Sequence, residues 1–269
     1  MINTMQAALI KKDLRSVIAN KNTLIPILIV PLIFTVLLPT MFILLTHFLP
    51  EENGDFQAML DLLPIDELSG DAVRDITALF LNRIMPVFFM IIPIMSASVM
   101  AASSFVGEKE KRTLETLLYC PLSLKQIFRA KIFASFSLSM LVSAASFLTM
   151  LVVSQAEILI ISGHLLLPDI IWLITMLLVS PSLALIAITI IVRGSAKAKT
   201  MEESQQRSVF LILPMLFLIV GQFTGLLLIN ALALWGFGVV FAIVALVCIR
   251  AAVRNLNYET LSIAMSSYK

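Results

Sequence analysis

Few side chains in this sequence have the types and spacing that catalysis, metal binding or nucleotide binding requires. The only histidines are His47 and His164, so the sequence can assemble neither an HExxH metal site nor a serine–histidine–aspartate nucleophile. The only cysteines, Cys120 and Cys248, form no disulfide framework or zinc pattern. No G-x-x-x-x-G-K-[ST] phosphate loop occurs, so the chain does not bind ATP in that way by itself. We therefore predict no enzyme, with no catalytic residue, no metal site and no cofactor bound by this chain.

The most informative segment is a charged run between two long apolar stretches. Residues 107–118 read Gly-Glu-Lys-Glu-Lys-Arg-Thr-Leu-Glu-Thr-Leu-Leu, and Pro121 follows. Opposite charges four residues apart favour a short helix, and these pairs are Glu108 with Arg112 and Lys111 with Glu115. Three leucines fall on one face of that helix: Leu114, Leu117 and Leu118. A charged helix with one apolar face either docks into a groove on a partner protein or lies on the inner membrane surface.

The composition places the protein in a lipid bilayer. Apolar residues make up 59% of the 269 residues, charged residues make up 13%, and the mean hydropathy is +1.01. Soluble domains have about 45–50% apolar and about 25% charged residues, so this chain cannot surround a packed core with a wettable surface. The net charge of +2 is too small to indicate a nucleic-acid binder. The sequence predicts an all-α membrane protein.

Six stretches are long enough to cross a bilayer, which takes about 20 mainly apolar residues. We predict a single transmembrane domain over 1–269 with spans at 23–48, 84–106, 132–153, 170–192, 208–229 and 231–249. The spans drawn in this way contain no acidic or basic residue. Because ion-coupled carriers keep such groups in the membrane, an independent proton-driven carrier is disfavoured.

The distribution of positive charge sets the orientation. Of the 19 Lys and Arg residues, only Arg74 and Arg83 fall on one side of the spans, which leaves 17 on the other side. The positive-inside rule then places both termini in the cytosol. Trp172 and Trp235 fall near the outer ends of their spans, where we expect their rings to lie at the membrane interface.

The segments that flank the spans also show helical patterns. In residues 1–22, apolar residues at helical spacing lie opposite Lys11, Lys12 and Arg15, which predicts an amphipathic helix at the membrane interface. The outer segment 49–83 is acidic, and apolar residues repeat at helical spacing after Asp71, a candidate N-cap. We expect one or two short helices on the outer face, either within a partly ordered loop or as a lid over an exit path.

The loop of residues 107–131 carries a resemblance to a known family. Its Gly107–Leu118 run, followed by Pro121, closely resembles the G-E-K-E-x-x-T-L-E-x-L-L-x-x-P segment of type 2 ATP-binding cassette (ABC-2) permeases. The second inner loop, 196–206, is similar to the loop before span five in permeases of the sodium-efflux and drug-export branch. The resemblance implies a coupling helix that contacts an ATPase, formed by Glu108, Lys109, Glu110, Arg112, Thr113, Glu115, Leu117 and Leu118.

The family also implies partners and a function. We expect a second permease subunit, identical or similar, and two separate ABC ATPase subunits that hold ATP and Mg. The expected function is export of an amphipathic or hydrophobic substrate, such as a peptide, lipid or drug, across the plasma (inner) membrane of a bacterium. Two other classes stay open: a non-transporting immunity or sensor subunit, and a self-contained channel or carrier.

Small residues and prolines recur within the predicted spans. Gly221 and Gly225 form a small-x-x-x-small pair, which indicates either a subunit interface or packing within the bundle. Serines recur every four residues on the third span, and there we favour internal packing: Ser135, Ser139 and Ser143. Prolines within four of the spans predict kinked helices.

Overall fold

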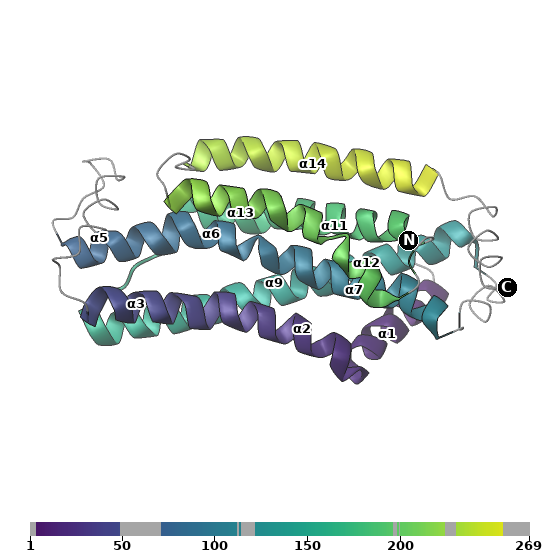
Figure 1. The fold of residues 1–269 in the computed structure, drawn as a ribbon, viewed down its shortest axis with the longest axis horizontal. Coiled ribbons are helices and arrows are strands. Elements are labelled where there is room, and N and C mark those ends of the chain that lie inside the picture. The colour runs from purple at the N-terminus through teal and green to yellow at the C-terminus, as the bar shows by residue number, and fades with distance from the viewer. Residues whose placement is uncertain are drawn as a thin grey trace.

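The computed structural model of the chain is a bundle of helices (Figure 1). It describes residues 4–48, 71–111, 113, 122–195, 198, 200–223 and 230–254. All regular structure in these ranges is helical, and six helices are long and apolar enough to cross a membrane. The all-α, six-span prediction is therefore confirmed.

The elements follow one another in this order. Helix α1 spans Thr4–Ala19, and the first spanning helix consists of α2 (Lys21–Leu32), η1 (Ile33–Leu37) and α3 (Leu38–Phe48). The second consists of α5 (Ala72–Leu79), η3 (Phe80–Ile84), α6 (Met85–Phe89) and α7 (Ile91–Glu110), and the third is α9 (Leu124–Ser162). The fourth consists of α10 (Ile170–Ile174), η4 (Thr175–Val179) and α11 (Ser180–Gly194). Helices α12 (Met201–Gln206), α13 (Val209–Phe223) and α14 (Ala231–Arg254) complete the chain.

The second and third spanning helices are much longer than the predicted spans 84–106 and 132–153. They cover Ala72–Glu110 and Leu124–Ser162. Hydropathy marks only the apolar part of a helix, whereas its ends are set by capping groups. A capping box formed by Ser123 and Gln126 begins α9, and Gly163 ends it with a φ of 70°. Charged residues that fell outside the drawn spans are therefore helical, among them Glu108, Lys131 and Glu157.

The outer segment shows a similar extension. Asp71 caps α5, as predicted, because its side chain accepts hydrogen bonds from the backbone N–H groups of Val73 and Arg74. However, α5 does not lie alone on the outer face, since it continues through η3 into the second spanning helix. Its Ile76 and Leu79 side chains are buried in the bundle, so residues 71–80 form no separate lid. The rest of the outer segment, 49–70, lies outside the described residues.

The bundle is built around α7, which has buried side chains on all sides. Figure 1 shows α6 and α7 between α13 and α14 on one side and α2 and α3 on the other. The serine stripe of α9 faces inward, as favoured: the Ser139 hydroxyl lies 3.0 Å from that of Ser96 and donates to the Pro93 carbonyl. Gly238 lets α14 approach the fourth helix, because a Cβ there would lie 2.6 Å from Leu178.

Three prolines coincide with π-helical turns. Pro39, Pro86 and Pro181 each follow the residue whose N–H closes a turn to the carbonyl five residues back, in η1, η3 and η4 respectively. A proline ring clashes with the carbonyl four residues before it, and a widened turn moves that carbonyl away. The structure thus accommodates these prolines by π-turns.

The π-turn η3 binds side chains of neighbouring helices. Its Leu81 carbonyl accepts the indole N–H of Trp172 at 3.0 Å, and its Arg83 carbonyl accepts the amide of Gln222 at 3.0 Å. Trp172 is therefore buried against Phe89 and Phe147 rather than at the membrane interface, where we predicted it.

Candidate coupling region at the charged end of the bundle

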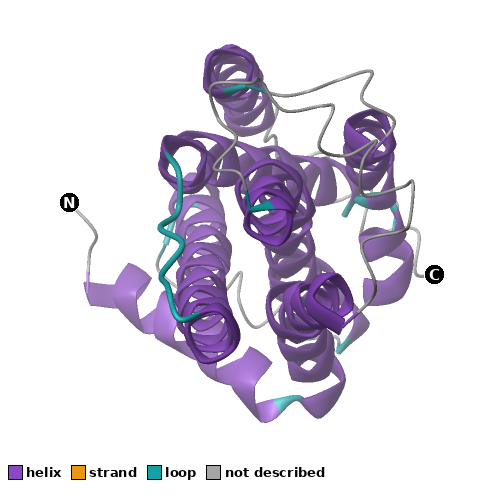
Figure 2. Ribbon diagram, turned by 90° about the vertical axis from the view of Figure 1, so that its left-hand side faces the viewer, coloured by secondary structure: helices purple, strands orange, loops and turns teal. Residues whose placement is uncertain are grey.

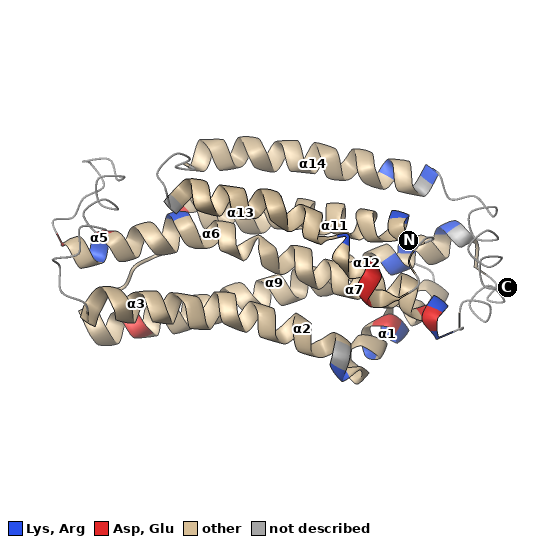
Figure 3. Cartoon of the chain, viewed as in Figure 1, with Lys and Arg blue, Asp and Glu red and all other residues tan. Residues whose placement is uncertain are grey.

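Charged residues gather at one end of the bundle, where α1, α12 and the end of α7 meet (Figure 3). Figure 2, which looks along the bundle, shows the helix next to the N-terminus lying across the other helices. This helix is α1, and its Leu9 and Val17 are buried against the bundle. The crossing orientation fits the predicted amphipathic helix of residues 1–22.

A buried ionic cluster ties α1 to α7 and α9. The Lys131 ammonium, whose residue is 2% exposed, lies 2.9 Å from a Glu108 carboxylate oxygen and 3.6 Å from a carboxylate oxygen of Asp13. Lys12 binds the other Glu108 oxygen at 2.5 Å. The Ser104 hydroxyl donates to Asp13, and the Ser104 carbonyl accepts from Lys131, each at 2.5 Å. Two acidic and two basic side chains thus meet in one cluster.

The environment of Asp13 favours its neutral form. Burial raises the pKa of the Asp13 carboxyl, and the negative charge of Glu108 raises it further. The Lys131 ammonium and the Ser104 hydroxyl lower this pKa, but burial is the larger effect. The contribution of Asp13 to the stability of the folded chain therefore depends on pH.

The last turn of α7 also contacts the second inner loop. The Lys109 ammonium donates to the Ala198 carbonyl at 3.2 Å, and a Glu110 carboxylate oxygen accepts from the Met201 N–H at 3.2 Å. Because Met201 is the first residue of α12, Glu110 places negative charge at that helix N-terminus. Gly107 leaves room for the Met201 side chain, whose sulfur would lie 2.9 Å from a Cβ there. The end of α7 is thus hydrogen-bonded to the segment that leads into α12.

Comparison with known proteins places this architecture in a family. The family model described as ABC-2 family transporter protein matches residues 7–238. The chain belongs to the ABC-2 family of transporter proteins. No curated protein and no solved structure matches it. As an ABC-2 protein with six spanning helices, it is a multi-pass membrane component of an ABC transporter, a transport subunit of a family that works with ABC ATPase partners.

The predicted coupling residues of this ABC-2 chain fall into two groups. Glu108, Lys109 and Glu110 lie in the last turn of α7, where they bind other parts of the same chain. Thr113 follows them, and its N–H and hydroxyl both donate to the Glu108 carbonyl. Glu108 is buried and pairs with Lys131 and Lys12, and its predicted pairing with Arg112 falls outside the described residues. The other predicted coupling residues lie outside the described residues: Arg112, Glu115, Leu117 and Leu118.

Sequence reasoning missed several members of the cluster. Asp13 is the only acid among the first 22 residues, and Lys131 opens the third span, but no sequence pattern brings them together. The single acidic residue on a basic amphipathic helix was the only sequence feature that could have indicated a buried ion pair. Of the predicted glycine pair, Gly221 is buried in α13 and Gly225 lies outside the described residues.

Proposed function

We propose that this ABC-2 chain is the transmembrane permease subunit of an ATP-driven exporter. Separate ATPase subunits supply the energy, and two permease chains, identical or similar, form the pathway. The cargo is an amphipathic or hydrophobic molecule, such as a peptide, lipid or drug, moved out of the cell across the plasma membrane. Both termini lie in the cytosol, as the positive-inside rule requires.

The connection between the inner loops and the spans carries this proposal. Through Glu108, Lys109 and Glu110, the end of α7 is bound to α1, α9 and the loop before α12. A partner that moves the coupling segment after Glu110 would therefore move several elements together. Packed elements joined by buried ion pairs transmit such displacements because they cannot deform gradually.

An ion-coupled carrier is a weaker explanation of the buried charges. Carriers use intramembrane carboxylates that bind and release their coupling ion. In this chain the cluster lies at the cytosolic ends of α7 and α9, and its two acidic side chains contact Lys12 and Lys131. Such a cluster supports a role in holding helices together.

The test is an affinity purification from the native membrane in mild detergent, with mass spectrometry and an ATPase assay of the eluate. We expect a co-purifying protein with a phosphate-binding loop, and ATP hydrolysis that is lost in Glu115→Arg. The matched control is Glu259→Arg, the same charge reversal in the C-terminal segment, which we expect to keep hydrolysis. Recovery of the chain alone, without hydrolysis, would favour a non-transporting or self-contained membrane protein.

A further inference from the structure

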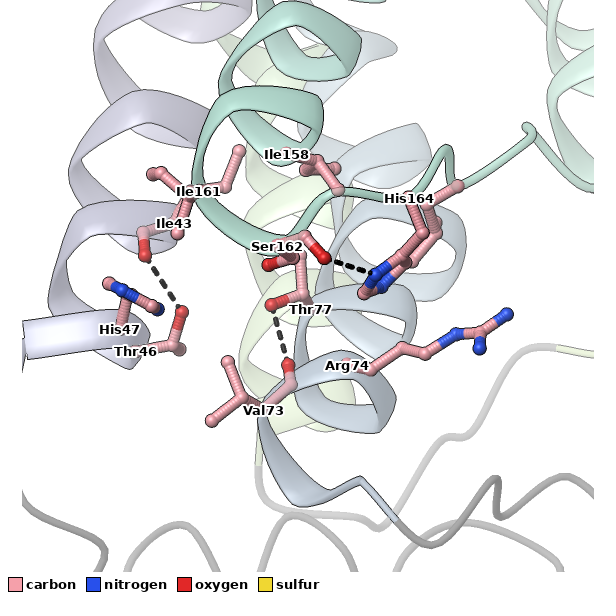
Figure 4. Close-up of a pocket in the computed structure, with 11 residues that line it drawn as sticks. Ile43, Thr46, His47, Val73, Arg74, Thr77, Ile158, Ile161, Ser162 and His164 are labelled. Carbon is pink, nitrogen blue, oxygen red and sulfur yellow. Dashed lines mark hydrogen bonds between the residues drawn. The ribbon is translucent and has the colours of Figure 1, made fainter.

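The two ends of the bundle differ in how their side chains pack. At the outer end, Figure 4 shows His47, Arg74 and His164 around a small pocket between the ends of α3 and α9 and the start of α5. The space that this pocket encloses is about 10 Å³, which is room for one water molecule and too small for a ligand. By contrast, the inner end is closed by α12, whose flanking side chains pack onto the second and fourth spanning helices.

Two glycines receive these side chains. At Gly107, in the last turn of α7, a Cβ would lie 2.9 Å from the sulfur of Met201. At Gly194, the last residue of α11, a Cβ would lie 2.6 Å from Nη1 of Arg207 and 2.8 Å from its Cδ. Each side chain thus lies in a notch that only glycine leaves open. Because Met201 begins α12 and Arg207 follows its last residue, α12 is held at both ends.

Helix α12 leads into the fifth spanning helix through a hydrogen-bonded turn. The Ser208 N–H donates to the Gln205 carbonyl at 2.9 Å, and the Leu211 N–H donates to the Ser208 carbonyl at 2.9 Å. Ser204 and Ser208 are both buried, so the turn packs against the bundle. A displacement of α12 therefore reaches α13 without a flexible linker between them.

We infer that Met201 is a positioning residue that makes the start of the fifth spanning helix follow the end of α7. The notch at Gly107 holds its side chain, and the Glu110 carboxylate accepts its backbone N–H. Helix α12 cannot slide along α7 unless both contacts break. In the proposed exporter, a partner that displaces the coupling segment after Glu110 moves α13 as well. Only this role in transport rests on the proposed function, because the contact itself lies within the chain.

The experiment is hydrogen–deuterium exchange with mass spectrometry on the purified full-length chain in detergent. Gly107→Ala places a methyl group against the Met201 sulfur and drives it from the notch. The exchange rates of α12 and of the first turn of α13 should rise about tenfold, because local opening no longer breaks this contact. Met201→Val, which leaves the notch empty, should raise them as well.

The double variant provides the rescue. Gly107→Ala combined with Met201→Val should restore the wild-type rates, since Cγ at position 201 lies 3.6 Å from the new methyl group, an ordinary contact. The matched control is Gly236→Ala, where a Cβ meets nothing within 4 Å, and it should leave α12 and α13 unchanged. Unchanged exchange in Gly107→Ala, or no rescue in the double variant, would overturn the inference. An equal rise throughout the chain would also overturn it, since the contact would then stabilise the whole fold.

A further variant tests whether α13 follows α7. Thr113→Val removes the hydroxyl that donates to the Glu108 carbonyl at the end of α7. In the wild-type chain this loosening should raise exchange in the first turn of α13, whereas in Gly107→Ala it should add nothing. Additive rises would show that the two helices move independently, against the inference. These measurements need no ATPase, so their failure is distinct from the failure of the proposed function.

Discussion

At the scale of single residues, the cost of burying charge explains the cluster around Lys131. An isolated ion is expensive to bury, and only paired charges persist in a protein interior. Here the acids come from α1 and α7, and the ammonium groups come from α1 and α9. Each helix therefore depends on the others for the neutralisation of its own charge. This dependence fixes where the interfacial helix sits against the spans.

Replacing Lys131 should destabilise the protein strongly. Lys131→Met leaves Asp13 and Glu108 buried with only Lys12 to compensate them, and breaking a buried ion pair typically costs about 3–5 kcal/mol. Lys125→Met is the matched control, because Lys125 is exposed in the first turn of the same helix. Thermal unfolding in detergent measures both. Equal losses in the two variants would show that the cluster adds nothing to stability.

The pH dependence of stability should reveal the titration of the Asp13 carboxyl. A carboxyl whose pKa is raised in the folded state stabilises that state below its ordinary pKa, and this contribution is lost as the pH rises through the raised pKa. Wild-type protein should therefore lose stability relative to Asp13→Asn as the pH rises from about 4 towards neutrality. Melting temperatures of both proteins across this range provide the test. A constant difference between them would mean that Asp13 does not titrate in that range.

At the scale of elements, the sequence predicted the helices well and their ends less well. Runs of apolar residues located all six spans, and the caps at Asp71 and Ser123 were recognisable as residue types. The lengths of the second and third helices were underestimated, since a helix continues wherever its backbone hydrogen bonds are met, including beyond the apolar region. Likewise, the prolines predicted kinks, but whether a proline produces a π-turn depends on neighbours such as Trp172, whose indole binds a freed carbonyl.

The packing of α14 should depend on one glycine. A Cβ at Gly238 would meet Leu178 at 2.6 Å and Val179 at 3.2 Å, whereas a Cβ at Gly236 would meet nothing within 4 Å. Gly238→Ala should therefore lower stability by about 1–3 kcal/mol, the usual cost of overpacking. Gly236→Ala, two residues earlier on the same helix, should be neutral or stabilising. Unfolding midpoints of the two variants in detergent decide this, and a harmless Gly238→Ala would show that Leu178 simply moves aside.

At the scale of the whole molecule, the sequence predicted a membrane protein and its family, but it did not predict the long-range contacts. Composition and the segment starting at Gly107 led to an ABC-2 protein, which the family match confirms. The cluster of Asp13 with Lys131 and the pocket of His47 with His164 join residues more than a hundred positions apart. Such pairs follow from how the helices pack, and periodicity within one helix contains no information about its neighbours.

The orientation of the whole bundle is the prediction with the widest consequences, because it decides which end an ATPase can reach. In a chain with Cys120 and Cys248 replaced by serine, single cysteines can be placed at the two ends of α9. Lys125 is exposed in its first turn, and Leu167 is 78% exposed just after its end. A membrane-impermeant maleimide should label Leu167→Cys in intact cells and Lys125→Cys only after permeabilisation, since 17 of the 19 basic residues favour a cytosolic location for the Lys125 end. The reverse pattern would place the coupling region outside the cell, where no ATP-driven partner could act on it.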